Sequence, residues 1–270
     1  MSHHHSAVSR LQILHFIDPL YALSGLAVGV LVGLTGVGGG SLMTPLLVLA
    51  FGVHPATAVG TDLLYAAATK TVGTGVHGLK GSVQWKIVAR LAAGSMPATI
   101  LTLWLLHRSG GASGGHLITM ALGWALLLTA GAVLFRDAIV RAFATRAKGL
   151  SEARVAVLTA VLGATLGCLV SLTSVGAGAL GMTILLILYP RTPIAKLVGS
   201  DIAHAVPLTL IAGLGHWLLG SVDWALLASL LTGSIPGIIL GSLAASRAPE
   251  GLLKPLLATT LFLVALKLLT

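Results

Sequence analysis

The sequence predicts an all-α polytopic membrane protein built from two homologous repeats. Of its 270 residues, 56% are hydrophobic and only 9% are charged, which is too little polar surface for a water-soluble protein of this size. Apolar runs about as long as the ~20 residues that cross a bilayer as helix follow one another along the chain. A set of motifs then returns after 138 or 139 residues, which indicates duplication. We expect about eight to ten membrane segments.

The repeated motifs carry Asp, His and Trp at fixed spacing, which low-complexity apolar sequence would not reproduce. The matching pairs are residues 35–40 with 173–178, 60–62 with 199–201, His77 with His216, 81–85 with 220–224 and 94–97 with 233–236. The chain therefore divides into an N-terminal tail at 1–18, a first repeat at 19–136, a basic cytoplasmic connection at 137–153 and a second repeat at 154–270, which together form one transmembrane domain.

Each repeat begins with an apolar segment that a Gly-rich motif breaks, and continues with three longer apolar runs. In the first repeat the broken segment is 20–34 with 42–51, and the runs are 57–77, 84–106 and 116–135. In the second repeat the broken segment is 155–172 with 179–189, and the runs are 194–219, 222–244 and 252–269. The halves of each broken segment are short for ordinary crossings, so each segment is either one interrupted crossing or a re-entrant hairpin or pair of short crossings.

Lys and Arg favour cytoplasmic loops, and their positions distinguish these two alternatives. With the 136–154 connection inside, a hairpin places twelve basic residues inside and three outside, whereas a single crossing places ten inside and five outside. The loop with Lys80 and Lys86 also matches a second-repeat loop whose charge is only Asp223, as expected if equivalent loops face opposite sides. The sequence thus predicts inverted repeats, with both termini in the periplasm of a bacterial inner membrane.

The two Gly-rich breaks are the candidate substrate site. A break exposes backbone groups that lipid cannot satisfy, and a helix that starts after it directs amide donors and its positive dipole end at an anion. Paired breaks near the midplane are typical of inverted-repeat transporters. Consecutive glycines at 38–40 exceed the needs of helix packing, whereas Gly25 and Gly29 have the spacing of helix contacts. The candidate substrate-binding residues are Thr35, Gly36, Val37, Gly38, Gly39, Gly40, Thr61, Thr173, Ser174, Val175, Gly176, Gly178 and Ser200.

Ionisable residues inside apolar runs are costly and point to function. Asp62 and Asp201 are equivalent in the two repeats, and they fit helix N-terminal caps equally well. Lys70 follows Asp62 by eight residues, and its equivalent is Thr209, so this charge belongs to one repeat. His204 follows Asp201 by about one turn and has a side chain suited to proton relay. The candidate charge and coupling residues are Asp62, Lys70, Asp201 and His204, with a proton as the candidate coupling ion.

Other classes of function have weak support. The basic residues lie in short connections, which indicates topology rather than nucleic-acid binding. The single cysteine, Cys168, excludes an internal disulfide, and the histidines at 3–5 lack a closed ligand geometry, so we expect no metal and no cofactor. The Gly-x-Ser-Gly string at 111–114 fits a rhomboid-like serine protease but lies in a connection, so this alternative is disfavoured and we expect no enzyme.

The chain resembles the sulfite exporter TauE/SafE family. The resemblance spans nearly the whole sequence and is carried by residues 33–40, 44–45, 58–62 and 81–85, with weaker matches at 176–178 and 199–201. It implies an inner-membrane permease for sulfite, an organosulfonate or a related small anion, driven by a proton or charge gradient and working without an ATPase. A passive anion channel that uses the same helix ends is the alternative that the residues leave open.

Overall fold

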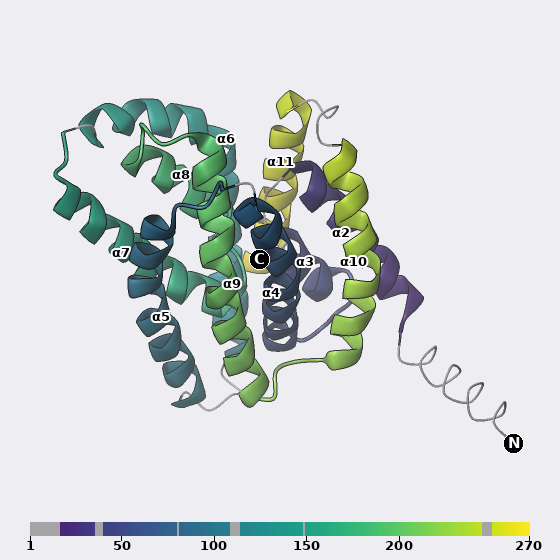
Figure 1. The fold of residues 1–270 in the computed structure, drawn as a ribbon. Coiled ribbons are helices and arrows are strands. Elements are labelled where there is room, and N and C mark those ends of the chain that lie inside the picture. The colour runs from purple at the N-terminus through teal and green to yellow at the C-terminus, as the bar shows by residue number, and fades with distance from the viewer. Residues whose placement is uncertain (1–16, 36–39, 80, 109–113, 148, 245–249) are drawn as a thin grey trace, which may run out of the picture.

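The computed structural model describes residues 17–35, 40–79, 81–108, 114–147, 149–244 and 250–270, and all the regular structure in these ranges is helical (Figure 1). The first half contains α2 (Pro19–Thr35), α3 (Gly40–Leu49), α4 (Pro55–Leu79), α5 (Trp85–Arg108) and α6 (Gly114–Ala147). The second half contains α7 (Glu152–Thr173), α8 (Ala179–Leu188), α9 (Ile194–Leu218), α10 (Trp224–Ala244) and α11 (Glu250–Leu269). Each predicted segment corresponds to one of these helices, so the all-α polytopic fold is confirmed.

Helix α6 differs most from its predicted range, because it ends at Ala147 rather than at 135. Much of the basic connection is therefore helical. Within His116–Phe143, α6 is long and apolar enough to cross a membrane. Beyond its predicted end, from Arg136 to Ala147, the helix is rich in Arg and Ala, which are strong helix formers.

Five of the described helices are long and apolar enough to cross a membrane. They are Trp85–Arg108, His116–Phe143, Glu152–Thr173, Ile194–Leu218 and Trp224–Gly241. Helix α4 has the same length as α9 but is not one of the five, because it carries Asp62, Lys70 and several threonines. Residues 58–67 of α4 are buried without interruption. Asp62 lies within this stretch, so lipid does not reach its carboxyl group.

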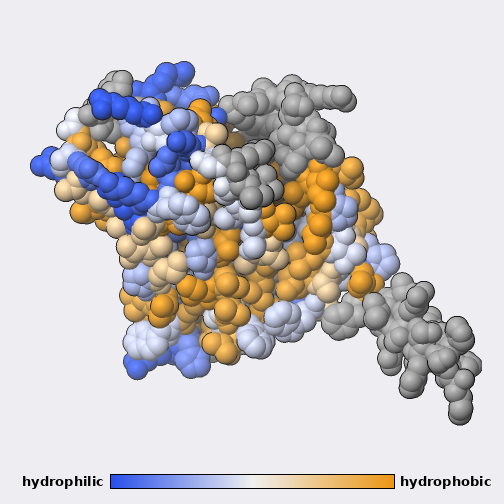
Figure 2. Space-filling view, in the orientation of Figure 1, coloured by the Kyte–Doolittle hydropathy of each residue, from blue (hydrophilic) through white to orange (hydrophobic). Residues whose placement is uncertain are grey.

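The surface of the molecule separates into an apolar band and a polar end. Figure 2 shows hydrophobic residues over the helical body and hydrophilic residues gathered at the end where Figure 1 draws the turn from α6 to α7. Large apolar side chains such as Leu101, Leu128 and Val161 are more than half exposed on this body. In a membrane protein such side chains face lipid.

The first helix of each half packs against a helix of the other half. Helix α2 lies against α10, and the equivalent helix α7 lies against α5. A Cβ added to Gly25 would lie 2.3 Å from the carbonyl oxygen of Leu230, and one added to Gly163 would lie 2.1 Å from that of Leu91. Gly25 and Gly163 are equivalent in the two repeats, and so are Leu91 and Leu230, so the two contacts are equivalent. The glycine spacing therefore marks close helix contacts, as predicted.

Each broken segment returns to the end of the molecule at which it begins. Near the start of α2, the ring of Tyr21 meets the ring of Phe51, just after α3, with centroids 5.0 Å apart. The equivalent residues of the second repeat, Thr159 and Tyr189, share a 2.8 Å hydrogen bond between their hydroxyls. The two helical arms of each broken segment therefore form a hairpin.

Helices α4 and α9 are equivalent in the two repeats and run antiparallel. Gly60 packs against His216, and further along α4 Gly73 packs against Ile202, which lies earlier in α9. Equivalent helices that pack antiparallel are related by an approximate twofold axis perpendicular to their length. If both helices cross the bilayer, this axis lies in its plane, as expected for inverted repeats. The orientation of the chain in the membrane stays a prediction.

Candidate functional site

The candidate site is organised by the two aspartates of the central helix pair. Asp62 on α4 is fully buried, and its Oδ2 accepts a 2.5 Å hydrogen bond from the hydroxyl of Thr44 on α3. Asp201 on α9 is 6% exposed, and a Cβ added to Gly181 on α8 would lie 2.9 Å from its Oδ1. Each carboxyl group thus faces the short second arm of the hairpin of its own repeat.

The break of the second repeat is a tight bend between α7 and α8. Ser174 ends α7 in the left-handed conformation, with φ 59°, and Gly176 has φ 117°. The hydroxyl of Thr173 donates to Leu169 O at 2.7 Å and accepts from the amide of Val175 at 3.1 Å, which stabilises the bend. Gly178 precedes α8 and supplies no side-chain cap. The amides of Gly181 and Met182 donate to Gly176 O and Gly178 O, at 3.2 and 3.1 Å. The amides of Ala179 and Leu180, at the very start of α8, have no carbonyl of the preceding helical turn to bond, which suits an anion.

The break of the first repeat lies largely outside the described residues. This applies to Gly36, Val37, Gly38 and Gly39. Helix α2 ends at Thr35 and α3 begins at Gly40, so the described helices stop on either side of the predicted break.

The hairpin tip of one repeat reaches the aspartate of the other. Ser174 is buried beside the carboxyl group of Asp62. Neither Ser174 Oγ nor Asp62 Oδ1 has a hydrogen-bond partner among the described residues. Buried polar atoms are nearly always paired, so this cluster is suited to a polar ligand, an ion or water.

Lys70 lies near both aspartates, although among the described residues it forms no ion pair within 4.0 Å with either of them. Its ammonium group on α4 is close enough to interact with both Asp201 and Asp62, and with the ring of His204. The antiparallel packing of α4 and α9 places the two aspartates toward opposite ends of the helix contact, with Lys70 between them. The structure thus brings together the four charged residues predicted from the sequence.

His204 occupies an asymmetric position in the site. Its Nε2 lies 2.8 Å from the hydroxyl of Ser95 on α5, within hydrogen-bonding distance. The residue at the equivalent position is Tyr65, whose hydroxyl is buried beside Ser234, the equivalent of Ser95. Sequence reasoning missed Tyr65, Ser95 and Ser234 as site residues. The 139-residue offset could have found them, because it aligns the Gly-Ser motifs at 94–95 and 233–234.

Three further predicted substrate-binding residues, like Thr173, make contacts within the protein. The hydroxyl of Thr61 accepts a 3.0 Å hydrogen bond from the amide of Asp223, and that of Ser200 accepts a 2.8 Å bond from the amide of Gln84. The first bond joins α4 to the loop before α10, and the second joins α9 to the loop before α5, so each connects the two repeats. Val175 is fully buried in an apolar cluster with residues of α6 and α11.

The comparison with known proteins assigns the family. The model of the family described as "Sulfite exporter TauE/SafE" matches residues 21–268. This chain belongs to the TauE/SafE sulfite exporter family. The TauE/SafE assignment agrees with the resemblance carried by the first Gly-rich motif and the Gly-Thr-Asp motif at 60–62.

The relatives of this TauE/SafE protein are named as membrane transporters. The chain is 40% identical over 253 residues to the "Probable membrane transporter protein YjnA" of Bacillus subtilis (strain 168), covering 92% of this chain and 98% of that protein. It is 29% identical over 252 residues to YdhB of the same organism, covering 89% and 96%. It is 30% identical over 231 residues to a "Probable membrane transporter protein" of Xylella fastidiosa (strain 9a5c), covering 83% of each. No solved structure matches.

The family assignment and the helical architecture lead to the same class of protein. The TauE/SafE chain is a multi-pass membrane transporter rather than an enzyme. Ser113 of the protease-like string lies outside the described residues.

Proposed function

We propose that this TauE/SafE protein is a secondary-active transporter that carries a small anion, sulfite or an organosulfonate, across a bacterial inner membrane. The observation that carries the proposal is the central cluster in which Ser174, at the hairpin tip of the second repeat, lies beside Asp62 of the first, with Lys70 between the two aspartates. The sulfur in the substrate rests on the family assignment.

The chemistry of this cluster fits an anion whose movement is linked to that of a proton. Lys70 offers a positive charge, and the amides of Ala179 and Leu180 at the start of α8 offer donors for oxygen atoms. Asp62 and Asp201 would repel an anion strongly in a medium of low dielectric constant if both were ionised. Protonation of these carboxyl groups removes that repulsion. We therefore propose that the anion and a proton occupy the cluster together.

Inverted repeats would let this cluster open to either side in turn. The antiparallel contact of α4 with α9 and the hairpin form of both broken segments support inversion. Leu150, Glu152 and Arg191 also line one cavity, so the 137–153 connection and the loop after α8 lie at the same end of the molecule. A single interrupted crossing would place those two loops on opposite sides.

Reconstitution tests the function directly. Purified protein in liposomes is expected to take up sulfite saturably, and faster when an inward proton gradient is imposed. A panel of sulfite, thiosulfate, sulfoacetate, sulfate and acetate identifies the preferred anion. Uptake at channel-like rates that ignores the proton gradient would favour a passive channel, and absence of anion uptake in every condition would refute the proposal. The variant Lys70→Gln is expected to lose most of the uptake.

A further inference from the structure

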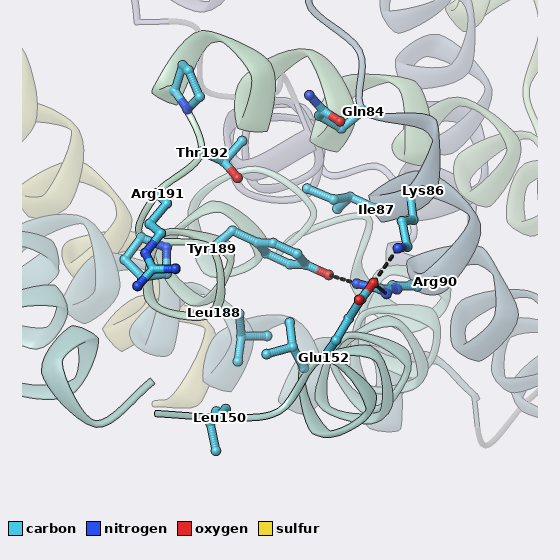
Figure 3. A pocket seen from close by; sticks show the side chains of 13 residues that line it. Gln84, Lys86, Ile87, Arg90, Leu150, Glu152, Leu188, Tyr189, Arg191 and Thr192 are labelled. Atoms are coloured by element: carbon cyan, nitrogen blue, oxygen red, sulfur yellow. Dashed lines mark hydrogen bonds and ion pairs between the residues drawn. The ribbon is translucent and has the colours of Figure 1, made fainter. Parts of the chain in front are cut away.

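A cavity lined by positive residues lies away from the central cluster, at the polar end of the molecule. Its volume is about 520 Å³, and segments from three parts of the chain form its walls. These segments are the start of α5, the start of α7 and the chain from the end of α8 to Pro193 (Figure 3). The charged residues that line the cavity are Lys86, Arg90, Glu152 and Arg191.

The cavity already holds one carboxylate between two cations. Lys86 Nζ donates to Glu152 Oε1, and Arg90 Nη2 donates to the same oxygen at 2.9 Å. Figure 3 shows Glu152 reaching this point from α7, with the tips of Lys86 and Arg90 converging on it from α5. The two cations are therefore spaced to bind an oxyanion of about the size of a carboxylate.

Arg90 is held in place from both arms of the second hairpin. Its Nη1 donates to the hydroxyl of Tyr189, just after α8, at 3.2 Å, and that hydroxyl is hydrogen-bonded to Thr159 on α7 at 2.8 Å. The side chain of Arg90 is only 16% exposed, whereas that of Glu152 is 70% exposed. The guanidinium group of Arg90 is thus fixed in place. The carboxylate of Glu152 that accepts from it is open to solvent, so an anion from solution can replace it.

The equivalent positions of the other pair of helices do not carry these charges. The repeat offsets align Lys86 with Ala225 and Arg90 with Ser229, and they align Thr159 and Tyr189 with the stacked rings of Tyr21 and Phe51. The hydroxyl of Ser229 accepts a 3.0 Å hydrogen bond from the amide of Asp18. The positive cavity therefore belongs to one end of the molecule, which the excess of Lys and Arg in its loops marks as cytoplasmic.

We propose that this cavity is an anion-loading site on the cytoplasmic side, at which a small oxyanion displaces the carboxylate of Glu152 from Lys86 and Arg90. The site would take sulfite, a sulfonate or a carboxylate, because each presents an anionic oxygen that can accept from both donors, as Oε1 of Glu152 does. Displacement frees the first residue of α7 from α5. Helix α7 is the first arm of the second hairpin and ends at Ser174, which lies beside Asp62. A shift of α7 therefore communicates occupancy of the cavity to the central cluster. This inference rests on the proposed anion transport.

The test measures the half-saturating sulfite concentration in membrane vesicles of both orientations. In inside-out vesicles, Arg90→Gln is expected to raise this concentration roughly tenfold, because it removes a charge-assisted donor. Glu152→Gln is expected to lower it, because it removes the internal competitor. In right-side-out vesicles both variants are expected to match the wild type. Arg154→Gln is the control, since Arg154 lies on α7 with Glu152, is exposed and does not line the cavity.

The outcomes separate this inference from the proposed function. Wild-type vesicles that transport none of the anions would refute the proposed function itself. Normal wild-type transport with an unchanged half-saturating concentration in Arg90→Gln and Glu152→Gln would refute the loading site alone. The gain of apparent affinity in Glu152→Gln is decisive, because a misfolded variant would not bind sulfite more tightly.

Discussion

Thr44 donates a 2.5 Å hydrogen bond to Oδ2 of Asp62, and both side chains are fully buried. This bond joins the second arm of the first hairpin to the central helix α4. A carboxyl group buried without its donor loses the compensation for its lost hydration. The contact therefore holds the first hairpin and the candidate site in one geometry.

The first prediction concerns that hydrogen bond. Thr44→Val is expected to destabilise the protein by about 1–3 kcal/mol, because it leaves a buried carboxyl oxygen without a donor. Thermal unfolding in detergent measures the effect. Thr129→Val is the matched control, since Thr129 is also fully buried but donates to Ala125 O within its own helix, at 2.7 Å. Equal losses of stability in the two variants would show that the hydrogen bond to Asp62 stabilises the protein no more than a hydrogen bond within one helix.

The exchanged packing of the two halves gives the second prediction. A Cβ on Gly94 would lie 1.8 Å from the carbonyl oxygen of Ala160, so Gly94→Ala must push α5 away from α7. We expect a loss of about 1–3 kcal/mol from this overpacking. Gly131→Ala is the control, because the added Cβ meets nothing within 4 Å and is expected to stabilise α6 by up to about 1 kcal/mol. Thermal unfolding of both variants decides the point, and a stable Gly94→Ala would contradict the packing.

The third prediction separates a packing role from substrate binding at Thr61 and Ser200. Both hydroxyls accept backbone amides of the opposite repeat, so Thr61→Val and Ser200→Ala are expected to lower stability by about 1 kcal/mol each. The half-saturating sulfite concentration of the folded protein is expected to stay unchanged. A large rise in that concentration without loss of stability would instead place these hydroxyls at the substrate.

Much of this fold was predictable because the duplication repeats chemistry as well as hydrophobicity. The recurrence of Gly-Thr-Asp at 60–62 as Gly-Ser-Asp at 199–201 is enough to locate the two central helices and their aspartates from the sequence alone. The basic loops favoured a hairpin over a single crossing, and the contact of Thr159 with Tyr189 agrees with the hairpin. Local composition and repeat spacing were sufficient for these conclusions.

Features that depend on contacts between distant segments were not predictable. The cavity around Arg90 combines residues near 86, 152 and 190, and no spacing in the sequence relates these three segments. The pairing of His204 with Ser95 likewise requires α5 to pack on α9. Serine and threonine hydroxyls can also bond nearby backbone groups, as that of Thr173 does. Sequence alone therefore cannot tell whether such a hydroxyl binds substrate or stabilises its own helix end.

The last prediction tests the inversion of the repeats by the accessibility of single cysteines. In a Cys168→Ala background, His54→Cys, Arg141→Cys and Arg191→Cys place a thiol at exposed positions in three different parts of the chain. In intact spheroplasts, a membrane-impermeant thiol reagent is expected to label only His54→Cys. Arg141→Cys and Arg191→Cys are expected to react only after the membrane is opened, because the hairpin of α7 and α8 returns the chain to the cytoplasmic side. Labelling of Arg191→Cys from outside, with Arg141→Cys protected, would mean that α7 and α8 together cross the membrane once, and the repeats would then be parallel.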